Sequence, residues 1–186
     1  MTSDLTAARI NMVESQVRTS DVTDWEVQDA MRQVAREDFC GGKTHLAYAD
    51  VEVEYAPGAY LAKPRDVAKL LQALKPRAGE KALAIAAPYA AAVLRQIGCS
   101  VDETDGESAN AGGYNLAICE AAVAETPSIW IDALAPGGRL AVIERQGPVG
   151  KAKLYVRTES DVGARGLFDA TPPFLKGHEP RKSFAF

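Results

Sequence analysis

Two groups of charged side chains in this sequence have the chemistry to bind a polar ligand. Glu103 ends a short segment that is typical of a strand, and Asp102 and Asp105 lie beside it. A carboxylate there can accept hydrogen bonds from ligand hydroxyls, although three acids near a strand end are also typical of a solvated turn. Lys63 and Arg65 lie at the expected start of a helix, where they could attract a carboxylate or remain solvated charges.

Other reactive side chains do not form a recognisable site. His45 and His178 have no second ligand group at metal-binding spacing, so no metal site is predicted. The cysteines Cys40, Cys99 and Cys119 are widely spaced and odd in number, which favours buried free thiols in a reducing compartment over disulfides. The sequence also contains no phosphate-binding loop and no serine nucleophile motif.

Length and composition place the chain among ordinary globular proteins. Its 186 residues are 47% hydrophobic and 25% charged, which indicates one domain with a sizeable core. A net charge of −4 argues against a nucleic-acid partner. The longest apolar run, Ala82 to Leu94, is too short to span a bilayer, and the first residues do not resemble a secretory signal. We therefore expect a cytoplasmic protein with no membrane association.

Residues 1–62 are predicted to form a helical extension followed by a β segment. Apolar residues at helical spacing are Ile10, Val13 and Val17, and then Val27, Ala30, Met31 and Val34. Thr23 and Glu26 form a capping box that predicts the start of the second helix. Residues 51–55 alternate between apolar and polar side chains, which predicts a strand that runs into the Pro57-Gly58 turn.

Residues 63–150 alternate between expected helices and strands. Helices are predicted from Pro64 to about residue 74, over 90–97, and from a Thr126-Pro127 cap to Leu134, and strands over 83–86, 99–103, 116–119 and 139–143. Residues 136–138 are predicted to form a turn. Residues 151–186 indicate a final β segment with antiparallel edge strands. This order predicts a single α/β domain with a doubly wound, mainly parallel sheet.

Several segments resemble one known family over nearly the whole chain. They are Asn11–Arg18 with Val22–Asp24, Val34–Phe39, Ala47–Asp50, Ala133–Leu140, and Gly166–Ala170 with Pro173–Leu175. These segments resemble protein-L-isoaspartate O-methyltransferases. The resemblance implies a Rossmann-like methyltransferase fold and S-adenosylmethionine as cofactor. It also implies methylation of the isoaspartyl carboxylate in damaged proteins, the first step of their repair.

The resemblance assigns cofactor positions that depart from the family pattern. The family's glycine-rich loop after the first strand corresponds here to Ala86, Ala87 and Pro88, which include no glycine and leave the loop about two residues short. Glycine would allow unusual φ angles and a close approach of the backbone to the ligand. The acid of that first strand is Ala84 here. Glu103 corresponds to the acid that binds the cofactor ribose.

Two further departures concern the sheet and the substrate side. Only the ten residues Thr104–Gly113 lie where the family has a helix, a strand and an adenine-side loop, so the sheet is expected to be shortened by about one helix and one strand. The family's active-site serine corresponds to Ala62, which has no hydroxyl. Lys63 and Arg65 remain as possible contacts for a substrate carboxylate.

These departures predict a family member that has lost efficient cofactor binding and catalysis and serves as a binding or scaffold module. The alternative is a functional S-adenosylmethionine-dependent methyltransferase acting on isoaspartyl proteins, and a third reading is a different small ligand at the altered turn. A lost strand also exposes a sheet edge, which predicts a homodimer or a protein partner there.

Overall fold

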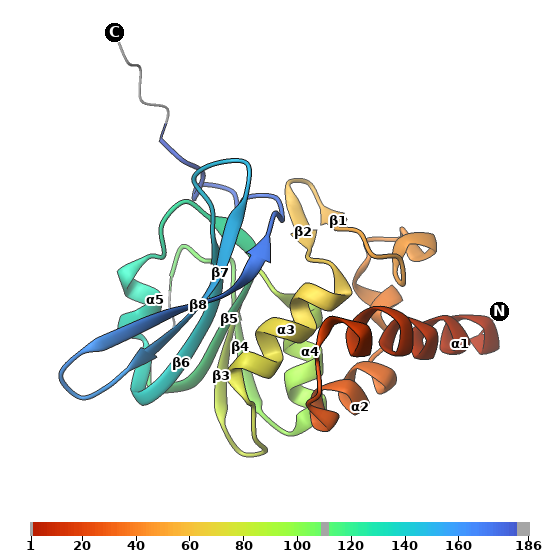
Figure 1. Cartoon of the computed structure of the whole chain (residues 1–186), viewed down its shortest axis with the longest axis horizontal. Coiled ribbons are helices and arrows are strands. Elements are labelled where there is room, and N and C mark those ends of the chain that lie inside the picture. Colours follow the sequence, from red (N-terminus) through yellow and green to blue (C-terminus); the bar gives the residue numbers. More distant parts are fainter. Residues whose placement is uncertain (1, 109–111, 182–186) are drawn as a thin grey trace, which may run out of the picture.

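The computed structural model describes residues 2–108 and 112–181 of the 186-residue chain. Its centre is a six-stranded sheet in the order β4-β3-β5-β6-β7-β8 (Figure 1). The strands are β3 Lys81–Ile85, β4 Ser100–Thr104, β5 Tyr114–Val123, β6 Leu134–Glu144, β7 Gly150–Arg157 and β8 Val162–Ala170. Neighbours from β4 to β6 pair in parallel, and β7 and β8 pair antiparallel. This arrangement confirms the predicted fold class.

Helices cover both faces of the sheet. They are α3 Pro64–Leu74, α4 Pro88–Ile97 and α5 Ser128–Asp132. Strand β3 shows why both faces need cover, since Ala82 and Ala84 belong to one buried cluster and Leu83 and Ile85 to another. The first cluster lies under α3, α4 and the N-terminal segment, and the second contains Trp130 of α5.

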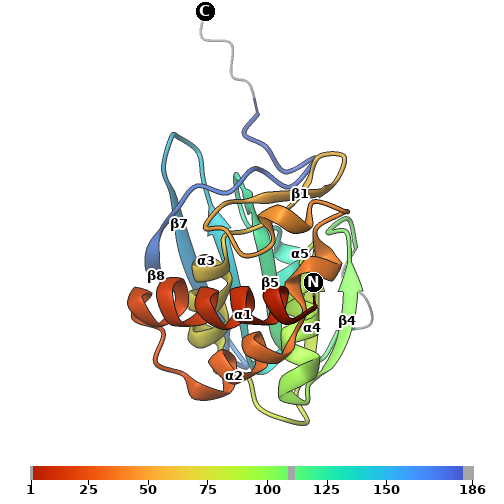
Figure 2. The same ribbon diagram turned by 90° about the vertical axis from the view of Figure 1, so that its right-hand side faces the viewer.

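The N-terminal segment is helical, as predicted, and lies outside the core helices. Figure 2 shows α1 and α2 on the outer side of α3 and α4. The elements are α1 Thr2–Met12, η1 Val13–Val17, η2 Arg18–Ser20, α2 Trp25–Gln33, η3 Arg36–Phe39, η4 Thr44–Leu46, and the hairpin β1 Val53–Ala56 with β2 Ala59–Leu61.

The predicted helix caps were wrong by one residue in two places. Asp24, and not Thr23, caps α2, because its side chain accepts the Val27 N–H at 3.1 Å. Pro127 is the N-cap of α5, which ends at Asp132, before the predicted Leu134. The hydroxyl of Thr126 instead donates to Glu144 at 2.6 Å. At α2 the neighbouring Asp24 oxygen takes the role predicted for Thr23, and at α5 the Thr126 hydroxyl is used by Glu144 instead of the helix.

The predicted turn at residues 136–138 is instead part of strand β6. Pairing with β5 shifts register between Tyr114 and Leu116, so the Pro-Gly-Gly segment is accommodated as an irregularity in the strand. A Cβ on Gly138 would lie 2.6 Å from the Tyr114 carbonyl oxygen. The glycine therefore allows two backbones to approach closely where a free turn was expected.

The connection from β4 to β5 is short for a parallel crossover. The two strands lie on either side of β3, and only residues 105–113 join them. Nine residues can reach roughly 30 Å when extended, which is enough to return along a five-residue strand without a helix. The described part of this connection, 105–108 and 112–113, contains no helix or strand. Strand β4 is therefore the edge of the sheet, consistent with the predicted shortening.

Candidate functional site

A pocket of about 700 Å³ lies at the carboxyl ends of β3 and β4. Open α/β sheets bind ligands in this place, because the loops that follow parallel strands diverge there. The pocket walls come from the β3–α4 turn, the end of β4, the β1–β2 hairpin and the segment 175–177. Its charged lining is Glu103, Asp105, Glu107 and Lys176, a net negative set.

The β3–α4 turn brings the predicted cofactor positions into this pocket. Ala86, Ala87 and Pro88 all line it, and the Ala86 N–H donates to the Thr104 carbonyl of β4 at 2.8 Å. Ala86 has φ +46°, a left-handed conformation that glycine adopts far more readily. Pro88 is the first residue of α4 and has no N–H to offer a ligand.

A buried carboxyl group accepts a hydrogen bond from the first turn of α4. Glu120 of β5 is fully buried and accepts the Ala90 N–H at 2.8 Å and the Ala62 N–H at 3.2 Å. Burial raises the pKa of Glu120, although the nearby Arg36 guanidinium and these two N–H groups lower it in part. The helix N-terminus is thus satisfied by a side chain from within the protein.

Arg36 connects the N-terminal segment to this buried group. The side chain is fully buried, donating from Nε to Ala47 O at 2.9 Å and from Nη2 to Ala62 O at 2.7 Å. Its guanidinium lies 4.7 Å from the centroid of the Tyr89 ring. Arg36 Nη1 and the Tyr89 hydroxyl are buried without a hydrogen-bond partner among the described residues.

The sequence reasoning missed Glu120 and Arg36. A signal was present, because Glu120 is the only charged residue in the apolar segment Leu116–Val123. A charge in an otherwise buried strand needs a partner in the folded protein. Arg36 lies in the segment Val34–Phe39 that resembles the family, and spacing alone does not distinguish its role from that of its neighbours.

The acids near the end of β4 all have partners within the protein. Glu103 is about half exposed and forms an ion pair with Arg95 at 2.7 Å. Asp102 accepts the Tyr114 hydroxyl at 2.8 Å, while burial, followed by this hydrogen bond, raises the pKa of Tyr114 to about 12. Asp105 accepts the Glu107 N–H at 3.1 Å. Glu103 and Asp105 both line the pocket, and the carboxylate of Glu103, the position that the resemblance assigns to the ribose, is already paired with Arg95.

The substrate-side positions lie apart from this pocket. Ala62 is buried, with its N–H bound to Glu120 and its carbonyl to Arg36. Lys63 pairs with Glu52 at 3.6 Å and Arg65 with Asp50 at 3.1 Å. Both basic residues line a different pocket, of about 280 Å³. The structure does not bring them to the predicted cofactor positions, and their role as carboxylate contacts stays a prediction.

Histidines and cysteines do not add a second centre. The His178 ring packs against Trp130 in a tilted arrangement, with centroids 5.3 Å apart. The three cysteines are buried, and burial raises the pKa of Cys119 to about 12 and that of Cys99 to about 11. Over residues 2–108 and 112–181, no three His, Cys, Asp or Glu side chains gather where they could hold a metal ion. No helix in the same ranges is long and apolar enough to cross a membrane.

The fold and this pocket define the class as a Rossmann-like α/β methyltransferase fold. A structure from Plasmodium falciparum, named as a protein-L-isoaspartate O-methyltransferase and solved with S-adenosyl-L-homocysteine, matches with a TM-score of 0.75. The match covers 90% of this chain and 98% of that one, at 16% identity. A second structure of a protein-L-isoaspartate O-methyltransferase matches with a TM-score of 0.72 over 96% of this chain and 67% of that one, also at 16% identity.

Sequence comparison then gives the family. The model of the family described as protein-L-isoaspartate(D-aspartate) O-methyltransferase matches residues 8–104, just over half of the chain, and the chain belongs to this family. A protein-L-isoaspartate O-methyltransferase of Methylorubrum populi is 38% identical over 98 residues, 51% of this chain and 46% of the relative. One of Rhodopseudomonas palustris is 42% identical over 94 residues, 49% of this chain and 38% of the relative. The match thus spans less than half the length of these relatives.

The residues present do not fit the family cofactor as a whole. The ribose hydroxyls of S-adenosylmethionine could donate hydrogen bonds to the Glu103 carboxylate. The carboxylate at the amino-acid end of the cofactor needs N–H donors. At the start of α4, Pro88 has no N–H and the Ala90 N–H already donates to Glu120. The turn therefore offers few donors where the family has a glycine-rich loop.

Proposed function

We propose that this chain is a family member that has lost efficient binding of S-adenosylmethionine and acts as a binding or scaffold module. The observation that carries the proposal is the Glu120 carboxyl group, which takes the Ala90 N–H at 2.8 Å. A ligand carboxylate near the start of α4 would compete with this internal acceptor for the same donor. It would also approach a second carboxyl group in a region of low dielectric constant, which is unfavourable.

The substrate side supports the same proposal. Ala62 has no hydroxyl, and both of its main-chain polar groups are used inside the protein. A reacting carboxylate and a methyl donor must be held in line within a few ångströms for transfer. Lys63 and Arg65 line another pocket and are paired with acids, so they do not supply that alignment in this conformation.

A functional methyltransferase acting on L-isoaspartyl residues is the second candidate, and one observation favours it. The chain has a pocket of about 700 Å³ at the ends of β3 and β4, with Glu103 on its wall. That volume suits a nucleoside-sized ligand. Its net negative lining is also compatible with a cationic sulfonium or with a different small ligand that carries hydroxyl groups.

Calorimetric titration with S-adenosylmethionine and S-adenosylhomocysteine separates the two candidates. A ligand at roughly 100 times its Kd stabilises the fold by about 2.7 kcal/mol, which a thermal shift would also detect. We expect no binding and no shift up to millimolar ligand. The Rhodopseudomonas palustris relative, treated in parallel, is the positive control. Micromolar binding, followed by methyl transfer to an isoaspartyl peptide, would establish the second candidate.

We further propose that the free edge of β4 is covered by a second copy of the chain or by a protein partner. β4 pairs with β3 alone. Ser100 N–H donates to Glu80 O, and Thr104 O accepts from Ala86 N–H, so the main-chain groups of every second residue from Ser100 to Thr104 point toward β3. The main-chain groups of Val101 and Glu103 therefore face outward, where Arg95 binds the Val101 carbonyl at 3.0 Å. An edge with free N–H groups is a template for another strand.

A further inference from the structure

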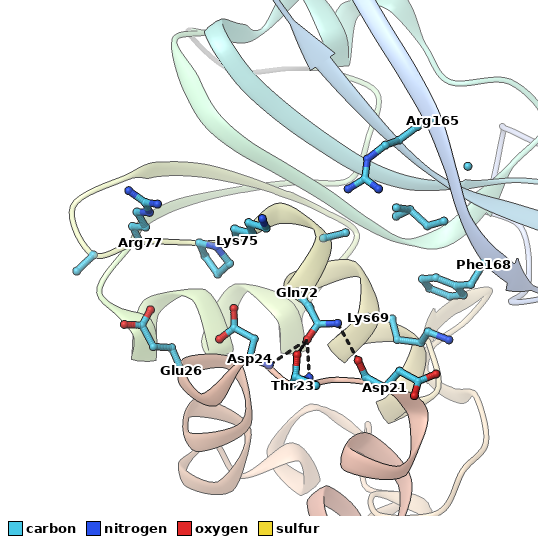
Figure 3. Close-up of a pocket in the computed structure, with 15 residues that line it drawn as sticks. Asp21, Thr23, Asp24, Glu26, Lys69, Gln72, Lys75, Arg77, Arg165 and Phe168 are labelled. Carbon is cyan, nitrogen blue, oxygen red and sulfur yellow. Dashed lines mark hydrogen bonds between the residues drawn. The ribbon is translucent and has the colours of Figure 1, made fainter.

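A second groove, of about 1,020 Å³, lies far from the pocket at the carboxyl ends of β3 and β4. It is bordered by the C-terminal half of α3, the loop 75–78, the loop before α2, and residues 165–168 of β8 (Figure 3). The loop 75–78 leads into the start of β3, so the groove lies toward the amino ends of the parallel strands. Nothing in the proposed function uses it.

Unpaired positive charge is concentrated in this groove. Lys75, Arg77 and Arg165 are exposed and have no ion pair or side-chain hydrogen bond among the described residues, and Lys69 contacts only the Phe168 ring, at 4.6 Å. In the described chain the other basic residues bind a carboxylate, a carbonyl or a ring, apart from Lys176 and Arg181 near the C-terminus. The groove lining also contains the acids Asp21, Asp24 and Glu26, which, over the residues that the structure describes, form no ion pair with these four cations. The cations on α3, the loop 75–78 and β8 therefore favour an anionic partner on their own side of the groove.

The same groove runs along an unpaired strand edge. β8 pairs with β7 only. Thr158 N–H donates to Asp161 O at 2.8 Å, and this bond shows which residues of β8 direct their main-chain groups toward β7 and which direct them away. Because these directions alternate along the strand, the main-chain groups of Ala164 and Gly166 point away from β7. Outside the ladder, no bond of the described chain uses them. Both residues have small side chains and are exposed, so another backbone can approach.

We propose that the edge of β8 binds an extended acidic peptide of a partner protein as an added strand. Main-chain hydrogen bonds to Ala164 and Gly166 would hold the peptide, and acidic side chains at alternate positions would meet Arg165, Lys69 and Lys75. Asp21, Asp24 and Glu26 line the opposite wall of the groove, beside α2, as Figure 3 shows. These three acids repel the acidic side chains of the peptide and so restrict them to the wall formed by α3 and β8.

Hydrogen exchange on the whole chain tests the strand addition directly. The probe is a labelled peptide that alternates glutamate and threonine, and the control is the same peptide with glutamine in place of glutamate. We expect slower exchange at the Ala164 and Gly166 amides with the acidic peptide, and no change at the Arg165 amide, which already faces β7. Unchanged exchange at all three amides in saturating acidic peptide would overturn the proposal.

Fluorescence anisotropy with variants tests both contributions. We expect Arg165→Glu combined with Lys75→Glu to weaken binding of the acidic peptide at least tenfold, and Arg181→Glu, the control, to leave it unchanged. Ala164→Pro removes one edge N–H and is expected to weaken binding to a similar extent. If Ala164→Pro binds normally, or inorganic tripolyphosphate competes as well as the peptide, the groove is a simple anion site and the proposal fails. Self-association that Ala164→Pro abolishes would assign the edge to a second copy instead.

Discussion

Ala86 is held in a backbone conformation that its side chain disfavours. Its φ of +46° lies in the left-handed region, where a Cβ crowds the following carbonyl. We predict that Ala86→Gly raises the free energy of unfolding by about 1 kcal/mol, because the native strain exceeds the added entropy of the unfolded chain. Urea unfolding measures this difference.

The neighbouring alanine provides the matched control. Ala87 has φ −134° and is buried, so Ala87→Gly gains no relief of strain and loses a packed methyl group. This variant should therefore be less stable than the parent. Equal effects of the two substitutions would show that the turn is not strained at Ala86.

Glu120 gives the protein a specific dependence of stability on pH. Burial raises its pKa in the folded state above the ordinary value of 4.5, so the folded protein binds more protons than the unfolded chain between those two pKa values. The stability contributed by the protonated group is complete below the unfolded pKa and is lost as pH rises through the folded pKa. We predict that the parent loses stability relative to Glu120→Gln over this interval, with a slope of up to about 1.4 kcal/mol per pH unit.

Urea unfolding of both proteins at a series of pH values checks the slope. The readout is the difference between the two curves, since glutamine also changes the hydrogen bonds to Ala62 and Ala90 by a constant amount. Glu125→Gln, at an exposed position, is the control and should follow the parent. Parallel curves for the parent and Glu120→Gln would contradict the assignment.

At the scale of elements, one side chain attaches the N-terminal segment to α3. Gln72 accepts the Thr23 and Asp24 N–H groups at 2.6 and 2.9 Å and donates to the Asp21 carbonyl at 3.0 Å (Figure 3). We predict that Gln72→Ala lowers the free energy of unfolding by about 1–2 kcal/mol, because three main-chain groups lose their partner. Limited proteolysis should cleave near residues 21–24 faster in this variant.

Gln96→Ala is the comparison for this prediction. Gln96 bonds the Gln33 side chain at 2.8 Å on the exposed surface, where water can replace it. Its loss should change stability by less than about 0.5 kcal/mol. An equally small effect of Gln72→Ala would mean that packing, and not the Gln72 contacts, holds the segment on the core.

For the whole molecule, the two edges of the sheet make separate predictions. If a second copy covers β4, light scattering will show a dimer that Val101→Pro weakens, because proline removes an outward N–H from the short strand. A monomer at every accessible concentration would count against a second copy at β4. That result would leave the β8 proposal untouched, because Ala164 and Gly166 lie at the opposite edge of the sheet.

The order of elements and the family could be predicted from the sequence because both depend on short-range patterns. The alternation at 51–55, the apolar spacing in 64–74 and the short interval before Tyr114 each act within a few residues. Predicted boundaries failed where two neighbouring groups compete, as at the cap of α2, or where distant pairing on both sides of residues 136–138 includes them in a strand.

Only the tertiary structure decided which polar groups meet. Glu120 reaches Ala62 across 58 residues and Ala90 across 30, and no local spacing encodes either contact. The predicted positions Ala86 and Glu103 share one pocket, whereas Lys63 and Arg65 line another. Periodicity specifies which face of an element is buried, but the partner of a charge depends on which elements pack against that face, and long-range packing alone sets that.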